Sequence, residues 1–297
     1  MSDIVKPKLD TGFKLLFASP ENENLLRSLI SGLLGIDEKN IQTIQIQNGE
    51  LLPEEADKKF GRIDLRLFLQ MVLTNNKVIN LELQIKPQDD FDDRSLFYWA
   101  KLFIADLKSG HEYSELPETI CLNIINFTMF GCEEYHSHFQ ILEKNRHELL
   151  NDKFAIHFYE LPKISKDNLE DADLMTLWLK LIDSESEEDL KMLETVKEPS
   201  IVQAVSFIRH MSADEKTREL ARQEEKRLHD EASIIGTAHR QGFREGIAEG
   251  MEKGERKKTQ RIAFRLFEKK KSDEDILDIL DISADELEKL KTEYTNM

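Results

Sequence analysis

Two carboxylates and a glutamine on neighbouring predicted strands have the residue types of a metal-dependent hydrolytic site. Side chains at i and i+2 of a strand share one face, so Glu82 and Gln84 project together, with Lys86 on the same side. Asp64 lies eighteen residues before Glu82, inside an otherwise apolar strand. One carboxylate from each of two strands suits a hard divalent cation, Mg²⁺ or Mn²⁺, which prefers oxygen ligands. Such a cation can position a water and offset charge on a phosphodiester.

The residues around Asp64 favour an anionic substrate. Residues 57–66 carry a net charge of +2 within an acidic part of the chain. Their basic members are Lys58, Lys59, Arg62 and Arg66. The alternative interpretation is a solvated strand face, because a strand with one wet face carries Asp, Glu, Gln and Lys for solubility alone. The spacing of Asp64, Glu82 and Gln84 leaves both interpretations open.

The elements that must position these residues follow from hydrophobic periodicity. They are a helix at 25–34 that ends at Gly35, strands at 41–47, 63–70, 81–86, 119–127 and 154–161, and a helix at 92–109. Strands that alternate with helices over the first 165 residues predict an α/β fold with a mixed sheet flanked by helices. The pattern after 166 is helical only, which predicts an all-α C-terminal region.

The strands at 63–70 and 81–86 predict an antiparallel pair. If residues 75 and 76 form the turn of a simple hairpin, Glu82 faces Leu69, five residues from Asp64. That separation is roughly 16 Å along the strand. A bulge, an asymmetric loop or strand divergence would then have to bring the two carboxylates together.

Four segments are expected along the chain. They are an α/β domain at 1–165, a helical extension at 166–211, a long polar helix at 212–271 and an acidic helical pair at 272–297. In the pair, Ser272 with Asp275 and Ser283 with Glu286 have the spacing of capping boxes.

A tetrapeptide repeat interrupts the long helix. Glycine recurs at 242, 246, 250 and 254, and Phe243, Ile247 and Met251 follow the first three. Each helical glycine costs about 1 kcal/mol relative to alanine. The repeat predicts either a self-association helix in which small residues let backbones approach, hence a homo-oligomer, or a partly frayed linker.

Charge and composition exclude several protein classes. The net charge of −17 argues against a protein that coats nucleic acid by bulk charge. Residues 255–271, however, hold eight basic and two acidic residues, and any phosphate contact outside a catalytic cleft is expected there. No apolar run approaches the roughly 18 residues of a membrane span, the start is polar, and two cysteines make no disulfide framework. We expect a cytoplasmic protein of two domains without a membrane partner.

An ordered set of motifs adds a resemblance. The set consists of Asp10-x-x-Phe13-Lys14-x-x-Phe17, a Lys-rich loop into Arg62-Ile63-Asp64, Asn80-Leu81-Glu82-Leu83-Gln84, Arg94-x-x-x-Tyr98, Ser109-Gly110-x-x-Tyr113 and Glu160-Leu161-x-Lys163. Together they resemble the Rpn family of recombination-promoting nucleases and transposases, within the PD-(D/E)XK nuclease superfamily. The resemblance is strongest over about residues 8–165.

The resemblance implies a restriction-endonuclease-like core and a DNA substrate. Asp64 and Glu82 would bind Mg²⁺, and Gln84 would stand where most of the superfamily has lysine. A neutral glutamine can only hydrogen-bond, so slow or conditional cleavage is expected. Lys86 is a candidate for the cation that most of the superfamily has at the position of Gln84. The alternative interpretation is that Lys86 is a solvated residue at the end of the strand.

Three further residues have both a functional and a structural interpretation. Arg94 would contact phosphate or orient Glu82, or else form a surface ion pair with Asp90 or Asp93. Tyr98 would lie beside the cleft or in the core. Asp10 is an auxiliary acid or, more simply, the N-cap of the first helix.

The histidines are given structural roles. His136 and His138, although near Cys132, lack a second ligand pair at zinc spacing and are interpreted as loop residues, and His157 as a strand residue. The leading functional hypothesis is thus a Mg²⁺-dependent DNA endonuclease acting in recombination or element mobility. The second is a weakly active or inactive nuclease fold that serves as an oligomeric nucleic-acid-binding or interaction module, and the third a purely structural protein.

Overall fold

The computed structural model describes residues 4–41, 44–48, 67–73, 77–105, 112–165, 169 and 171–296. Two compact units make up the chain, Met1–Glu225 and Lys226–Met297. The divisions expected at 165 and 211 fall inside the first unit and stay predictions.

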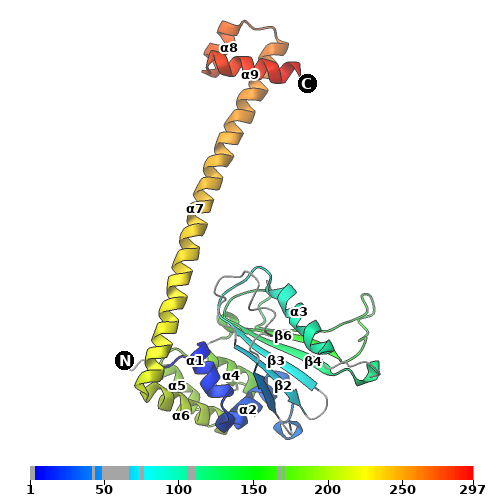
Figure 1. Ribbon diagram of the computed structural model, residues 1–297, viewed down its shortest axis with the longest axis vertical. Coiled ribbons are helices and arrows are strands. Elements are labelled where there is room, and N and C mark those ends of the chain that lie inside the picture. The colour runs from blue at the N-terminus through cyan, green and yellow to red at the C-terminus, as the bar shows by residue number, and fades with distance from the viewer. Residues whose placement is uncertain are drawn as a thin grey trace. The chain divides into compact units, whose positions relative to one another are not determined.

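A six-stranded mixed sheet forms the centre of the first unit (Figure 1). Its strands are β1 (Gln45–Asn48), β2 (Leu67–Leu73), β3 (Lys77–Gln84), β4 (Glu118–Ile125), β5 (His136–Phe139) and β6 (Phe154–Glu160). Their order is β1-β2-β3-β4-β6-β5. The β3–β4 and β4–β6 pairs are parallel and the other three are antiparallel, so the predicted mixed sheet and the antiparallel β2–β3 pair are confirmed.

Helices cover both faces of this sheet. The α-helices within the described residues are α1 (Asp10–Phe17), α2 (Glu23–Leu34), α3 (Phe91–Ile104), α4 (Leu174–Ile182), α5 (Glu187–Glu194), α6 (Pro199–Ala213), α7 (Glu215–Glu268), α8 (Asp273–Leu280) and α9 (Ala284–Thr295). Sheets with parallel strands are normally buried on both faces. The strands β3, β4 and β6 accordingly have every residue but the first of β3 and β4 buried.

One face of the sheet packs against α2. The Tyr159 hydroxyl on β6 donates to the carbonyl of Leu33 at 2.6 Å, which joins the sheet to this helix. Trp178 of α4 is fully buried, and its indole N–H donates to Ser28 Oγ on α2 at 3.2 Å. A Cβ on Gly32 would lie 3.2 Å from Leu174, so α2 and α4 approach closely at this glycine.

The helix α3 covers the opposite face. Phe91 is 1% exposed and packs with Cys121, Ile156 and Phe158, which alternate on that face of β4 and β6. The Trp99 indole N–H donates to the Thr119 carbonyl at 2.8 Å, which fixes the helix along β4.

Several element boundaries differ from the predicted ones. The helix predicted at 25–34 is α2, and it ends at Gly35 in the left-handed conformation with φ of 63°. The strand predicted from 41 begins only at Gln45. The helix predicted at 92–109 is α3, and residues 106–110 lie outside the described part.

The second unit combines the end of α7 with α8 and α9. Its small apolar core contains Ala263, Ile276, Leu287 and Leu290. The two capping serines have the predicted role, because Ser272 Oγ accepts from the Asp275 N–H at 3.2 Å and Ser283 Oγ from the Glu286 N–H at 3.3 Å.

The helix α7 is continuous through the glycine repeat. Glycines 242, 246, 250 and 254 are exposed, and a Cβ on any of them would meet open space. Their neighbours Phe243, Ile247 and Met251 are 64%, 48% and 64% exposed. No helix in the described part of the chain combines the length and apolarity that crossing a membrane would take.

Candidate active site

Three polar side chains alternate along the face of β3 that α3 covers. Asn80, Glu82 and Gln84 are 1%, 1% and 2% exposed, while Leu81 and Leu83 enter the core on the other face. A buried carboxylate is costly unless it is paired and hydrogen-bonded. The burial of Glu82 therefore contradicts the interpretation of this strand face as a solvated surface.

Arg94 on α3 supplies the partner of Glu82. Its Nη2 donates to Glu82 Oε1 at 3.1 Å and to Gln84 Oε1 at 3.2 Å, and its Nη1 bonds Gln88. The guanidinium lies 4.6 Å from the centre of the Phe91 ring, and only 10% of the Arg94 side chain is exposed. The ion pair of Arg94 is thus with the strand carboxylate.

Gln84 is held at both ends of its amide. Its Oε1 accepts from Arg94, and its Nε2 donates to the Lys86 carbonyl at 2.9 Å. The backbone carbonyl of Gln84 accepts from the Asn126 N–H at 2.9 Å, which holds the end of β3 against the residue just beyond β4. The side-chain bonds fix the Gln84 amide beside the Glu82 carboxylate.

The oxygen atoms around Glu82 suit a hard cation. Asn80 Oδ1 and Asn123 Oδ1 are buried and have no hydrogen-bond partner among the residues that the structure describes. Asn123 on β4 pairs in register with Glu82, and both lie on the face that α3 covers. Carboxylate and amide oxygens are donors that Mg²⁺ accepts, so the residues present fit the predicted metal.

The second predicted carboxylate, Asp64, lies outside the described residues, as does Lys59. Within the described part of the chain, no group of three His, Cys, Asp or Glu side chains comes together as a metal site. Among the described residues, the oxygens that could share a cation with Glu82 include the buried amide oxygens of Asn80 and Asn123.

The register of β2 and β3 corrects one expectation. Glu82 pairs with Phe68 and not with Leu69. The hairpin is shifted by one residue from the turn assumed at 75 and 76, and Phe68 is four residues from Asp64 in sequence.

A neighbouring thiol responds to the Glu82 charge. Burial, and then the nearby Glu82 carboxylate, raise the pKa of Cys121 on β4, while a hydrogen bond with Asn80 opposes the shift. Cys121 is therefore a neutral core residue beside Asn80 and Glu82.

The remaining predicted residues lie at different places. Lys86 follows β3 and is partly exposed. Tyr98 is 8% exposed on α3 and packs 5.7 Å from the Phe97 ring. Asp10 accepts from Lys14 Nζ at 2.8 Å, and no contact among the described residues joins it to Glu82.

The N-cap interpretation of Asp10 is wrong by one position. Leu9 is the N-cap and makes no side-chain cap, whereas Asp10 is the first helical residue. The α1 N–H groups are instead capped by Glu224 of α7, whose carboxylate accepts from the Asp10 N–H at 2.7 Å and from the Thr11 N–H at 3.1 Å.

Glu160 and Lys163 form a structural clamp. Glu160 is fully buried, and its Oε1 accepts from the Met129 N–H at 2.6 Å and the Phe130 N–H at 3.2 Å. Its Oε2 pairs with Lys163 Nζ at 2.6 Å, and Lys163 also donates to the Phe130 carbonyl. The pair holds the segment after β4 against the end of β6.

The histidines form a stacked group at the sheet edge. His136 and His138 lie in β5, so their interpretation as loop residues is wrong. His136 Nε2 and His157 Nδ1 are 3.0 Å apart, and the rings of His138 and His157 stack at 4.0 Å. Burial, and then the charges of His138 and His136, lower the pKa of His157 to about 3.

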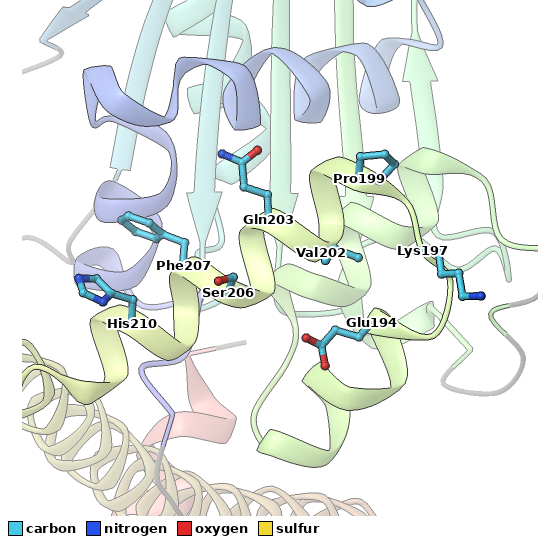
Figure 2. Close-up of a pocket in the computed structure, with 8 residues that line it drawn as sticks. All are labelled: Glu194, Lys197, Pro199, Val202, Gln203, Ser206, Phe207 and His210. Carbon is cyan, nitrogen blue, oxygen red and sulfur yellow. The ribbon is translucent and has the colours of Figure 1, made fainter.

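A separate hollow of about 980 Å³ lies on α5 and α6 (Figure 2). It is lined by Glu194, Lys197, Pro199, Val202, Gln203, Ser206, Phe207 and His210. Glu194 is paired with Arg209 at 2.6 Å, and Gln203 accepts from Asn24 at 2.7 Å. The hollow contains none of the predicted site residues.

Asn80 and Asn123 were not among the predicted site residues. Asn80 could have been found, because it shares the alternation of Glu82 and Gln84. Asn123 could not, since only the parallel pairing of β3 with β4 brings it beside Glu82.

The comparisons agree with this geometry. The family model described as PD-(D/E)XK nuclease family transposase matches residues 7–238. No curated protein and no solved structure gives a significant match. The match covers the mixed sheet, its flanking helices and the buried Glu82–Arg94–Gln84 group. The chain therefore belongs to the PD-(D/E)XK nuclease family transposases.

Proposed function

We propose that this protein is a DNA endonuclease that hydrolyses phosphodiester bonds with Mg²⁺ or Mn²⁺ and promotes recombination or mobile-element transfer. The observation that carries the proposal is the buried Glu82 carboxylate, which Arg94 pairs at 3.1 Å beside the fixed Gln84 amide. A polar group of this kind in the interior of a nuclease-family fold is costly to keep without a function.

Each residue has a role in the proposal. Asp64 and Glu82 would hold the metal, which when bound would supply charge compensation and activation of a water. Gln84 orients the attacking water by hydrogen bonding. Arg94 is a positioning residue, because it fixes the Glu82 carboxylate. Lys86, Tyr98, Asp10 and Lys59 are auxiliary or substrate-binding candidates.

Plasmid nicking tests the proposal directly. The protein is incubated with supercoiled plasmid in Mg²⁺, in Mn²⁺ and in EDTA, alongside Glu82→Gln and Asp64→Asn. We expect metal-dependent nicking that falls by roughly a hundredfold or more in either variant, since losing one charge-stabilising group costs that much in comparable sites. Unchanged nicking in Glu82→Gln would refute the assignment.

Glu118→Gln is the matched control. Glu118 also lies on a strand of the sheet and pairs with a cation, Lys77, at 2.5 Å. It is the first residue of β4 and therefore lies away from Asn123, the β4 residue that pairs with Glu82. We expect its nicking rate to equal that of the unmodified protein. A loss as large as that of Glu82→Gln would indicate a general effect of strand charges.

The second candidate function is that of an oligomeric nucleic-acid-binding or interaction module. It is favoured by the exposed row Phe243, Ile247 and Met251 beside the open glycine row of α7. A ridge at four-residue spacing next to a groove without side chains suits packing of two copies at a crossing angle of about −50°. The glycine row of one copy would then receive the apolar row of the other.

Charges beside these rows favour a parallel pair. On each copy, Glu245 and Lys253 lie on the outer side of the glycine row, and Arg244 and Glu252 lie on the outer side of the apolar row. In a parallel pair related by a two-fold axis, the outer side of one copy's glycine row faces the outer side of the other copy's apolar row. Glu245 would then face the second copy's Arg244, and Lys253 its Glu252. An antiparallel pair would set Glu245 against Glu249.

Alanine in the glycine row separates association from helix propensity. Gly246→Ala with Gly250→Ala should strengthen the helix by about 1 kcal/mol per site, yet fill the groove and shift a dimer toward monomer. Gly236→Ala, outside the repeat, should strengthen the helix alone. Light scattering after size-exclusion chromatography measures the mass, and an unchanged mass of the double variant would refute this interface.

The two functions are separable in the same variants. If the endonuclease proposal holds, Gly246→Ala with Gly250→Ala keeps metal-dependent nicking, and Glu82→Gln keeps the mass. We place the protein in the cytoplasm, a proposal supported by two free cysteines, the buried Cys121 and the exposed Cys132.

A further inference from the structure

Four basic side chains form a row near the end of α7. The basic row consists of Lys257, Arg261, Arg265 and Lys269, all exposed. Neighbours four residues apart lie about 6 Å from each other along the helix axis, so the row extends about 18 Å. Among the described residues, none of the four makes a side-chain hydrogen bond or an ion pair.

The acidic helices α8 and α9 leave this row open. They pack on the side of α7 that carries Ala263, which is fully buried, and Phe264, whose ring lies 5.2 Å from Tyr294. Residues two apart on a helix project to nearly opposite sides, so Arg261 and Arg265 face away from Ala263.

The acids of the tail have partners elsewhere. Glu293 of α9 accepts from Arg256 at 3.2 Å and from Gln260 at 2.8 Å. Asp273 of α8 pairs with Lys291 of α9 at 2.7 Å. These contacts tie the helices of the second unit together without neutralising the basic row.

We propose that the basic row binds the phosphate backbone of duplex DNA, at a site distinct from the nuclease centre. Its length of about 18 Å matches about five base pairs at 3.4 Å each. Single strands require aromatic side chains on which bases stack, whereas Phe264 and Phe267 pack against Tyr294. A row of free positive charge without a stacking platform is suited to a duplex backbone.

The test measures binding without cleavage. Fluorescence anisotropy of a labelled 24-base-pair duplex is recorded in EDTA at 50–200 mM NaCl. Four phosphate contacts give a slope of about −3.6 for log K against log salt, which is a loss of about a hundredfold in affinity over this range. In a variant with all four row residues changed to glutamine, the slope should become shallower by about that amount.

A charge-matched control accompanies the row variant. Lys216, Lys226, Arg240 and Lys289 are exposed basic residues of α7 and α9 outside the row. Changing these four to glutamine removes the same net charge and should leave the slope within one unit of the original. An equally shallow slope in both variants would show that only the net charge of the protein matters, and it would overturn the proposal.

Two further arms complete the design. Lys257→Gln with Arg261→Gln, a smaller change, should give half the slope difference, and unchanged binding in both row variants would also overturn the proposal. Tighter binding to single-stranded RNA of equal length than to the duplex would overturn the choice of ligand. Because binding in EDTA needs no cleavage, a salt slope that depends on the basic row would support this proposal even if the nicking test failed, whereas nicking without such a slope would overturn this proposal alone.

Discussion

At the residue scale, the Glu82–Arg94 pair is the most constrained interaction of the candidate site. Glu82 is 1% exposed and Arg94 10%, so neither charge is well solvated if the other is removed. The net contribution of such a pair is small, but loss of one partner leaves an isolated buried charge.

Removing the Arg94 charge should therefore destabilise the fold strongly. We expect Arg94→Met to lower the free energy of unfolding by about 3–5 kcal/mol, measured by urea denaturation. Arg94→Met combined with Glu82→Gln should recover much of this loss, because the unpaired carboxylate is gone. Equal stabilities of the single and double variants would contradict the charge-pair explanation.

The histidine group predicts a pH dependence of stability. The pKa of His157 is lowered to about 3 in the folded protein, against an ordinary 6.5. Below pH 6.5 the unfolded chain binds more protons, so stability falls as pH decreases, by up to about 1.4 kcal/mol per pH unit. Thermal melts of the protein and of His157→Gln between pH 7.5 and 5 measure this, and the variant should lose part of the slope. A slope that is the same in both would show that other groups cause it.

At the element scale, α1 depends on a carboxylate far along the chain. Glu224 accepts from the Asp10 and Thr11 N–H groups and from Thr11 Oγ1 at 2.9 Å. A negative group at a helix N-terminus satisfies free N–H groups and also interacts favourably with the helix dipole.

Glu224→Ala should cost about 0.5–2 kcal/mol, the usual effect of losing an N-cap. Its neighbour Glu225 provides the control, because it pairs with Lys6 at 2.8 Å with 31–40% of both side chains exposed. Exposed pairs contribute little, so Glu225→Ala should be close to neutral. Chemical denaturation compares the two variants, and equal losses would contradict the capping role.

At the scale of the whole molecule, the sequence predicts what depends on local pattern and misses what depends on distant pairing. The periodicity of β2, β3, α2 and the capped α8 and α9 is local, and these elements were predicted. β5 has only four residues and gains its place from β6. The cap of α1 comes from Glu224 over two hundred residues away.

The residues of the candidate site also divide into those that the sequence predicts and those that depend on distant pairing. Glu82 and Gln84 follow from alternation on one strand, whereas the partner of Arg94 could only be narrowed to Glu82, Asp90 or Asp93 from the sequence. Asn123 becomes part of the site only through the β3–β4 register, and the β2–β3 register differs by one residue from the simple hairpin.

Association through the glycine row would also change how the protein binds DNA. If two copies cross near Gly246 at about −50°, their helices diverge between the crossing point and the basic rows. One pair of copies would then present two basic rows to the same duplex. The number of phosphate contacts would double from four to eight, and the salt slope would steepen from about −3.6 to about −7.

The Gly246→Ala and Gly250→Ala variant, as a monomer, should return to the shallower slope while keeping its basic row intact. Anisotropy titrations over 50–200 mM NaCl, run at concentrations where light scattering gives the mass, compare the two forms. A monomeric variant that keeps the steep slope would show that one copy supplies all the contacts and that pairing serves another purpose.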